Sequence, residues 1–234
     1  MKRPRRQWEA DRYSRSMGER IHIDAAPGDT DAYLAPARPP PGAPILLLHA
    51  WWGLNETIRD LADRLAGDGF TVMAPDLLDA VLTTIEDAEA HTTAIEQGGG
   101  QSEGLNPDRI MGRVQAALDH LLSHSDARGG RAGIIALSFG GWYGSGVAAA
   151  RSDIAAFVSI YSDVFEAPGG AAYLGHFAEQ DPYVDATQVA EGSTVHVYPG
   201  TKHWFMESDR PEFDAAATEL AYARTVAFLR EQLD

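Results

Sequence analysis

Residues 131–146 read Arg-Ala-Gly-Ile-Ile-Ala-Leu-Ser-Phe-Gly-Gly-Trp-Tyr-Gly-Ser-Gly. An apolar run that ends at Leu137 leads to Ser138, and a segment rich in glycine and alanine follows directly. This pattern is typical of a nucleophile elbow, a tight turn from strand to helix that exposes the hydroxyl of its serine. Such a turn needs small residues two positions before and after the serine. Here they are Ala136 and Gly140, where the usual motif has glycine at both places. A buried strand followed by an ordinary turn is the competing interpretation.

Short apolar runs alternate with segments of helical periodicity from residue 45 to the end of the chain. Continuous apolar runs predict strands that are buried on both faces of a parallel sheet, and apolar residues at i, i+3, i+4 and i+7 predict helices. The sequence therefore predicts an α/β fold with a mostly parallel, doubly wound sheet, whose ligands bind at the carboxyl ends of the strands. A hairpin with a Pro-Gly-Asp turn precedes this sheet. The expected strands are 21–24, 31–35, 45–49, 70–74, 133–137, 154–161, 171–178 and 194–198, and the expected helices begin near residues 55, 83, 106, 140 and 211.

The chain is expected to form one domain over residues 21–234, preceded by a basic leader at 1–20. The leader holds seven of the 19 basic residues and has a net charge of +4, so the remainder carries −19. One long interruption, residues 77–105, contains a predicted helix and the break Gly98-Gly99-Gly100. We interpret this interruption as a small cap or mobile rim over the site.

The bulk composition excludes several classes of protein. With 44% hydrophobic and 23% charged residues the chain resembles ordinary globular proteins, and its net charge of −15 argues against a nucleic-acid partner. No apolar run approaches the roughly 20 residues that cross a membrane, and none follows the basic leader as in a secretory signal. There is no cysteine, so no disulfide or thiolate metal site is expected. These features predict a cytoplasmic monomer or homodimer that acts on a small molecule.

A serine hydroxyl is a weak nucleophile at neutral pH, so it needs a base and an acid that orients this base. Around a nucleophile elbow these partners follow the serine in the order Asp or Glu, then His. The best histidine is His203, just past a predicted strand, because the other seven lie in predicted strands or helices, in the hairpin, or away from the expected place. The best acid is Asp181, which also follows a strand; Asp163, after the preceding strand, is its rival. A simple Asp-Pro turn is the alternative role of Asp181.

An oxyanion hole at such an elbow takes one backbone N–H from the residue after the serine, here Phe139. The second comes from the loop after the first parallel strand, where residues 49–53 read His-Ala-Trp-Trp-Gly, so Trp51 is the predicted donor. Core packing is the alternative role of the tryptophans. The candidate substrate-binding side chains are Trp52, Trp142 and Trp204.

Four segments, taken in order, resemble motifs of the dienelactone hydrolase family, which has the α/β-hydrolase fold. They are Leu-His-Ala-Trp-Trp-Gly-Leu-Asn-Glu-Thr-Ile-Arg-Asp-Leu at 48–61, Ala-Pro-Asp-Leu at 74–77, Ala-Glu-Gln-Asp-Pro-Tyr-Val at 178–184 and Tyr-Pro-Gly-Thr-Lys-His-Trp-Phe at 198–205. The resemblance spans roughly residues 20–232 and implies a hydrolase that needs no cofactor or metal. The namesake enzymes use a cysteine nucleophile and a glutamate in the oxyanion loop, where this chain has Ser138 and Ala50. In those enzymes the glutamate helps to keep the cysteine thiol unreactive. A serine hydroxyl needs no such control, so the two changes agree with an ordinary serine esterase.

The namesake substrate is a dienelactone carboxylate held by arginines, and this chain departs from that pattern as well. It has no arginine between Leu77 and Asp108, and Glu207 lies four residues past the predicted base. We therefore expect a small, neutral carboxylic ester or lactone, cleaved through an acyl-enzyme. An acyltransferase or perhydrolase with the same three residues is one alternative, and a non-catalytic binding protein on the same fold is another.

Overall fold

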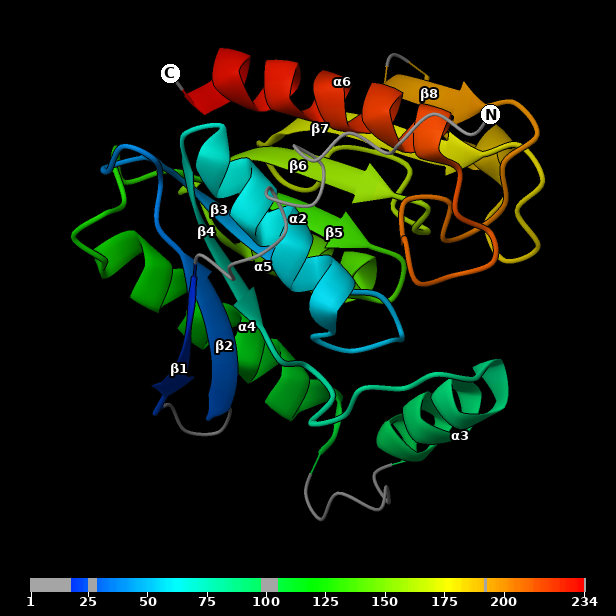
Figure 1. Ribbon diagram of the computed structural model, residues 1–234, viewed down its shortest axis with the longest axis horizontal. Coiled ribbons are helices and arrows are strands. Elements are labelled where there is room, and N and C mark those ends of the chain that lie inside the picture. The colour runs from blue at the N-terminus through cyan, green and yellow to red at the C-terminus, as the bar shows by residue number, and fades with distance from the viewer. Residues whose placement is uncertain (1–17, 25–28, 98–104, 192, 234) are drawn as a thin grey trace, which may run out of the picture.

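The computed structural model describes residues 18–24, 29–97, 105–191 and 193–233. Eight strands of this part of the chain form one sheet, in the order β1-β2-β4-β3-β5-β6-β7-β8 (Figure 1). The strands are β1 Glu19–Ile23, β2 Thr30–Ala35, β3 Ala43–Leu48, β4 Phe70–Pro75, β5 Ala132–Leu137, β6 Ile154–Ile160, β7 Ala172–Ala178 and β8 Thr194–Tyr198. Each lies within two residues of its predicted position at either end. The leader up to residue 17, most of the Pro-Gly-Asp turn and the glycine triplet at 98–100 lie outside the described residues.

The pairing of the strands confirms the predicted fold class. β1 and β2 form the expected antiparallel hairpin, and β2 pairs antiparallel with β4. The remaining pairs, from β4 across to β8, are all parallel. Strand β4 lies on one side of β3 and β5 on the other, so the winding of the chain reverses between β3 and β5. The carboxyl ends at such a reversal are where open α/β sheets bind their ligands.

Helices cover both faces of the sheet. The described helices are α2 Glu56–Gly67, α3 Ile85–Glu96, α4 Pro107–Ser123, α5 Gly140–Ala150 and α6 Ala215–Leu233, with a single 3-10 turn, η1, at Ala186–Gln188. Alternate residues of each strand point to opposite faces, so Ile45 and Leu47 pack beneath α2 and α6 while Leu46 and Leu48 pack beneath α4 and α5. Helix α3 stands apart from these layers (Figure 1). Among the described residues, no helix combines the length and apolar character that crossing a bilayer requires.

The starts of three helices can be compared with their predicted positions. Asn55 and Asn106 stand where the sequence predicts that α2 and α4 begin, and each side chain accepts a hydrogen bond of 3.0 Å from the backbone N–H three residues on. The last helix is a correction, because it begins at Ala215 and not at Pro211. The Asp214 carboxylate accepts the backbone N–H groups of Ala216 and Ala217 at 3.0 and 2.9 Å, which fixes the first turn there.

Helix α5 lies close against the sheet because its glycines leave room. A Cβ built at Gly140 would lie 2.7 Å from the Leu48 Cβ and 2.9 Å from the His49 carbonyl oxygen. The sequence predicts that small residues are needed at Gly140 and Ala136, and at Gly140 the atoms that require it belong to the last residue of β3 and the residue after it. Small size at Gly140 therefore sets how closely the elbow approaches the loop that follows β3.

We expect Gly140→Ala to lower the free energy of unfolding by about 1–3 kcal/mol, because the added methyl overpacks the junction of α5 and β3. Thermal or urea unfolding measures this loss. Gly67→Ala is the matched control, since a Cβ at this helical glycine meets nothing within 4 Å. An unchanged stability of Gly140→Ala would contradict the close approach.

Candidate active site

Ser138 occupies the turn between β5 and α5 in a left-handed conformation, with φ 46°. Its N–H donates to the Ile160 carbonyl at 2.9 Å, and its own carbonyl accepts from the Gly141 N–H at 2.8 Å. A positive φ costs a non-glycine residue roughly 1–3 kcal/mol, so the surrounding contacts must hold it. The half-buried side chain stands at the carboxyl end of a central strand. This is the backbone geometry expected of a nucleophile elbow.

The structure brings His203 to the serine. The Ser138 hydroxyl lies 2.8 Å from His203 Nε2, although 65 residues separate them in the chain. His203 stands in the loop after β8, and its side chain is only 3% exposed. The next residue, Trp204, also has a positive φ, of 66°. Backbone strain thus occurs on both sides of the Ser–His hydrogen bond.

Asp181 completes a hydrogen-bonded line from the serine. Its Oδ2 accepts from His203 Nδ1 at 2.7 Å, and this places the proton of the neutral ring on Nδ1 and leaves Nε2 as acceptor for the serine hydroxyl. Its Oδ1 accepts from the backbone N–H groups of Tyr183 and Val184 at 2.9 and 3.0 Å. These bonds fix the carboxylate in the loop after β7. The rival acid, Asp163, is exposed after β6 and takes no part in the line.

Three aromatic rings surround the His203 imidazole. Tyr161, Tyr183 and Trp204 have ring centroids 5.0, 5.1 and 4.8 Å from it. Only Trp204 is among the residues that the sequence singles out. Tyr161 directly follows β6 and Tyr183 comes two residues after Asp181, so position at a strand's carboxyl end is the signal that would have found them. The rings exclude water from the imidazole and limit its rotation.

The two predicted oxyanion donors lie in the loops that flank Ser138 and β3. Phe139 is the N-cap residue of α5, and Trp51 lies in the turn after β3. Among the described residues, neither backbone N–H donates a hydrogen bond to a protein group. A free N–H at a helix N-terminus is suited to binding negative charge. Both backbone N–H groups are therefore free to donate to a ligand.

The candidate substrate-binding tryptophans differ in exposure. Trp142 is 58% exposed at the start of α5, whereas Trp52 and Trp204 are only 2% and 3% exposed. Trp52 packs edge-on against Trp204, with the Arg210 guanidinium over its other surface at 4.2 Å. Trp52 therefore lies in the core beneath the site, and Trp204 contributes the ring that packs on His203. Tyr183, 45% exposed and in edge contact with Trp51, provides an aromatic surface that the sequence did not indicate.

Glu207 is a buried carboxyl group in this region. Its side chain is 1% exposed, Oε1 accepts the Tyr161 hydroxyl at 3.0 Å, and Oε2 has no hydrogen-bond partner among the described residues. Burial raises the pKa of Glu207 to about 8, against the opposing effect of the Tyr161 hydrogen bond. The carboxyl is therefore mostly neutral at pH 7, and it contacts His203 only indirectly, through the Tyr161 ring that packs on the imidazole.

We expect Glu207→Gln to gain stability relative to the wild type as the pH rises from 5 to 8. The unfolded chain releases the Glu207 proton near pH 4.5 and the folded chain near pH 8. Between these values the contribution of Glu207 to the free energy of unfolding falls by about 1.4 kcal/mol per pH unit. The glutamine does not titrate, and a relative gain of about 2–4 kcal/mol follows over this range. Urea unfolding at pH 5, 6.5 and 8 measures the difference, with the exposed Glu231→Gln as control. Parallel pH curves for wild type and Glu207→Gln would contradict the assignment.

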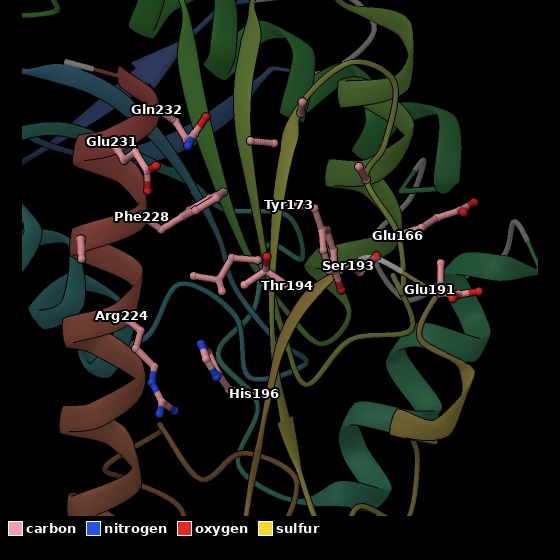
Figure 2. A pocket seen from close by; sticks show the side chains of 16 residues that line it. Glu166, Tyr173, Glu191, Ser193, Thr194, His196, Arg224, Phe228, Glu231 and Gln232 are labelled. Atoms are coloured by element: carbon pink, nitrogen blue, oxygen red, sulfur yellow. The ribbon is translucent and has the colours of Figure 1, made fainter.

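A separate hollow of about 830 Å³ lies away from this line. It opens between α6 and the first residues of β7 and β8, as Figure 2 shows with Arg224 and Phe228 on the helix and Tyr173 and Thr194 on the strands. Its lining shares no residue with the Ser–His–Asp line, whose Asp181 and His203 follow the opposite ends of β7 and β8. The hollow is therefore separate from the candidate active site.

Comparison with known proteins finds similar sequences over most of the chain. A model of the dienelactone hydrolase family matches residues 30–233. A protein of Azospirillum brasilense named "Putative carboxymethylenebutenolidase" is 28% identical over 222 residues, which make up 88% of this chain and 95% of that protein.

Solved structures with the same fold include two from metagenomic libraries. A dienelactone hydrolase-like promiscuous phosphotriesterase superposes with a TM-score of 0.75 at 17% identity, over 93% of this chain and 98% of its own. A cold-adapted esterase from an Arctic intertidal library superposes with a TM-score of 0.68 at 20% identity, over 93% and 94%. At these identities the two structures show a shared fold alone.

Proposed function

Since the chain belongs to the dienelactone hydrolase family, we propose that it is a serine hydrolase that cleaves a small, neutral carboxylic ester or lactone through an acyl-enzyme. The family and the name of the Azospirillum brasilense relative support hydrolysis of a lactone or ester. The observation that carries the proposal is the line Ser138–His203–Asp181, with both hydrogen bonds between 2.7 and 2.8 Å. Nothing in the stability of the sheet requires these three side chains to meet.

The first half of the reaction forms the acyl-enzyme. Ser138 Oγ attacks the carbonyl carbon while its proton moves to His203 Nε2. Asp181 accepts the Nδ1–H bond and stabilises the imidazolium that results. The negative charge that develops on the carbonyl oxygen is bound by the Phe139 and Trp51 N–H groups. The tetrahedral intermediate then breaks its bond to the leaving oxygen, which takes the proton from Nε2.

The second half releases the acyl group. A water molecule gives its proton to His203 Nε2 and attacks the ester carbonyl of the acyl-enzyme, and the same two amides bind the oxyanion. The bond to Ser138 Oγ breaks and the serine recovers its proton from the imidazole. A lactone follows the same steps, except that its leaving alcohol remains part of the acyl chain, so hydrolysis of the acyl-enzyme releases a single hydroxy acid.

The surroundings of the serine favour a neutral substrate. Two exposed aromatic side chains support this substrate class, because apolar rings bind uncharged acyl groups. Tyr183 has its ring centroid 5.1 Å from that of His203, and Trp142 comes four residues after Ser138 in the chain. The nearby acids Asp181 and Glu207 are buried, and the chain as a whole carries a charge of −15. A carboxylate on the substrate would meet repulsion from this overall field.

The proposal is tested with p-nitrophenyl acetate, butyrate and octanoate beside p-nitrophenyl succinate, whose acyl group carries a carboxylate. We expect turnover of the neutral esters and a kcat/KM at least about tenfold lower for the succinate, a difference of about 1.4 kcal/mol. Preference for the anionic ester would reject the neutral substrate class. Absence of turnover with all four esters and with a panel of lactones, in folded protein, would reject hydrolysis itself.

A further inference from the structure

His49 makes two hydrogen bonds that tie the oxyanion loop to the rest of the fold. It directly follows β3, and its side chain is 0% exposed. Its Nδ1 lies 2.7 Å from the Ala50 carbonyl oxygen, and its Nε2 lies 3.0 Å from the Leu77 backbone N. A carbonyl only accepts and a backbone N–H only donates, so the ring is neutral with its proton on Nδ1. Both nitrogens are therefore committed to structure and neither is available for proton transfer.

The first of these bonds acts on the peptide group that carries a predicted oxyanion donor. The Ala50 carbonyl and the Trp51 N–H belong to the same planar peptide unit, which is trans, so the two groups point in opposite directions. A donor that holds the carbonyl on one side thereby aims the N–H to the other. Besides His49, the Gly53 N–H donates to the same carbonyl, at the long distance of 3.3 Å. The imidazole supplies the shorter of the two bonds.

The second bond connects this loop to the loop after β4. Two further contacts join the same pair of loops. The Leu82 N–H donates to the Trp52 carbonyl at 3.2 Å, and the Ala80 carbonyl lies against Gly53, whose φ is 80° and whose position leaves no room for a Cβ. The Leu77 N–H in the loop after β4 thus fixes the His49 ring, and the ring in turn fixes the Ala50 carbonyl.

We propose that His49 is a positioning residue that fixes the Ala50–Trp51 peptide so that the Trp51 N–H is aimed at the oxyanion. This inference rests on the proposed function, since it concerns the same site. His49 touches neither the serine nor the substrate; it acts through the peptide that it holds. Without the imidazole only the longer Gly53 bond opposes rotation of this peptide, and rotation turns the N–H away from the developing charge.

Burial supports the neutral ring that this arrangement needs. It lowers the pKa of His49, against the opposing charge of Asp76 in the loop after β4. A protonated ring would present a hydrogen to the Leu77 N–H in place of a lone pair, and the link between the two loops would break.

Two substitutions separate the two hydrogen bonds. In His49→Asn the side-chain amide takes the place of Nδ1–H and can donate to Ala50, but it does not reach Leu77. In His49→Gln the amide oxygen takes the place of Nε2 and can accept from Leu77, but no donor faces Ala50. His176→Gln is the matched control, because His176 is an equally buried histidine whose ring bonds go to Tyr198 and Thr225.

For each variant, kcat, KM and the inhibition constant of phenylboronic acid are measured with p-nitrophenyl butyrate as substrate. The melting temperature is measured on the same samples. The boronate adduct of the serine carries a tetrahedral oxyanion, so its affinity reports on the oxyanion donors.

We expect His49→Gln to lower kcat about 10- to 100-fold, near the effect of losing one donor. Phenylboronic acid should bind more weakly by a similar factor while KM changes less than about threefold. His49→Asn should recover most of kcat, and His176→Gln should lose melting temperature but not kcat. If His49→Gln does not fold, His49→Met serves as the variant without a donor.

Equal losses of kcat in His49→Asn and in the variant without a donor would overturn the proposal. So would an unchanged boronate affinity, or a loss of kcat that follows melting temperature in the same way as in His176→Gln. These outcomes require that the wild type turns over its ester. A wild type that turns over none of the four esters and none of the lactones rejects the proposed function instead, and the two failures are distinct.

Discussion

Replacing Ser138 with alanine should lower kcat/KM for the neutral esters by about 10⁴- to 10⁶-fold, the range seen when a serine hydrolase loses its nucleophile. The variant keeps the two oxyanion amides and the substrate surface, so any residual rate comes from water attack assisted by these groups. The fold should persist, because alanine removes only a hydroxyl that the half-buried turn does not need for its backbone bonds. Steady-state rates and circular dichroism on the same samples test both parts.

A covalent probe gives an independent test of the same residue. A fluorophosphonate should label the wild type at Ser138 and leave Ser138→Ala unlabelled. Ser145→Ala is the control, because this serine lies on α5, the helix that follows Ser138, and its hydroxyl donates to the Trp142 carbonyl at 2.9 Å. Two results would remove Ser138 from the mechanism: retained turnover in Ser138→Ala, or labelling that is lost in Ser145→Ala and kept in Ser138→Ala.

Replacing Asp181 with asparagine should lower kcat about 10³- to 10⁴-fold at neutral pH. In the wild type the carboxylate accepts a hydrogen bond from His203 Nδ1. The asparagine amide donates to Nδ1 instead, and this favours the tautomer with its proton on Nε2. Such a ring cannot take the proton of Ser138. KM should change little, since the 2%-exposed carboxylate lies behind His203 and does not face the substrate.

Asp163→Asn is the matched control, because this exposed acid follows the neighbouring strand β6. It should keep kcat within about a factor of two, as surface substitutions away from special features usually have small effects. A large loss in Asp163→Asn together with a small one in Asp181→Asn would reverse the assignment of the acid.

Much of the fold follows from signals that are local in the sequence. The buried strands are continuous apolar runs, and α2 and α4 begin next to Asn55 and Asn106, where the sequence predicts their starts. Chain order then places Ser138, Asp181 and His203 after β5, β7 and β8, and parallel pairing brings the ends of these strands to one edge. Strand order therefore predicts from the sequence alone that these three distant residues lie close together.

The remaining features depend on packing between segments. The start of α6 is decided by the Asp214 cap against a competing Pro211 signal, and Trp52 is buried because Arg210 and Trp204 cover it. The burial of Glu207 and the rings of Tyr161 and Tyr183 around His203 arise only when the loops after β6, β7 and β8 meet. No periodicity or spacing in a single sequence encodes such contacts.

The proposed nucleophile and its base differ in how firmly the sheet holds them. Ser138 follows β5, which has a parallel neighbour on each side, whereas His203 follows β8, which among the described strands pairs with β7 alone. Local opening of a protein begins where fewest contacts must break, and an edge strand opens at a lower free energy than the centre of the sheet. Fraying of β8 would separate the base from a serine that is still in place. The proposed reaction therefore depends on the local stability of the last strand more than on that of the whole fold.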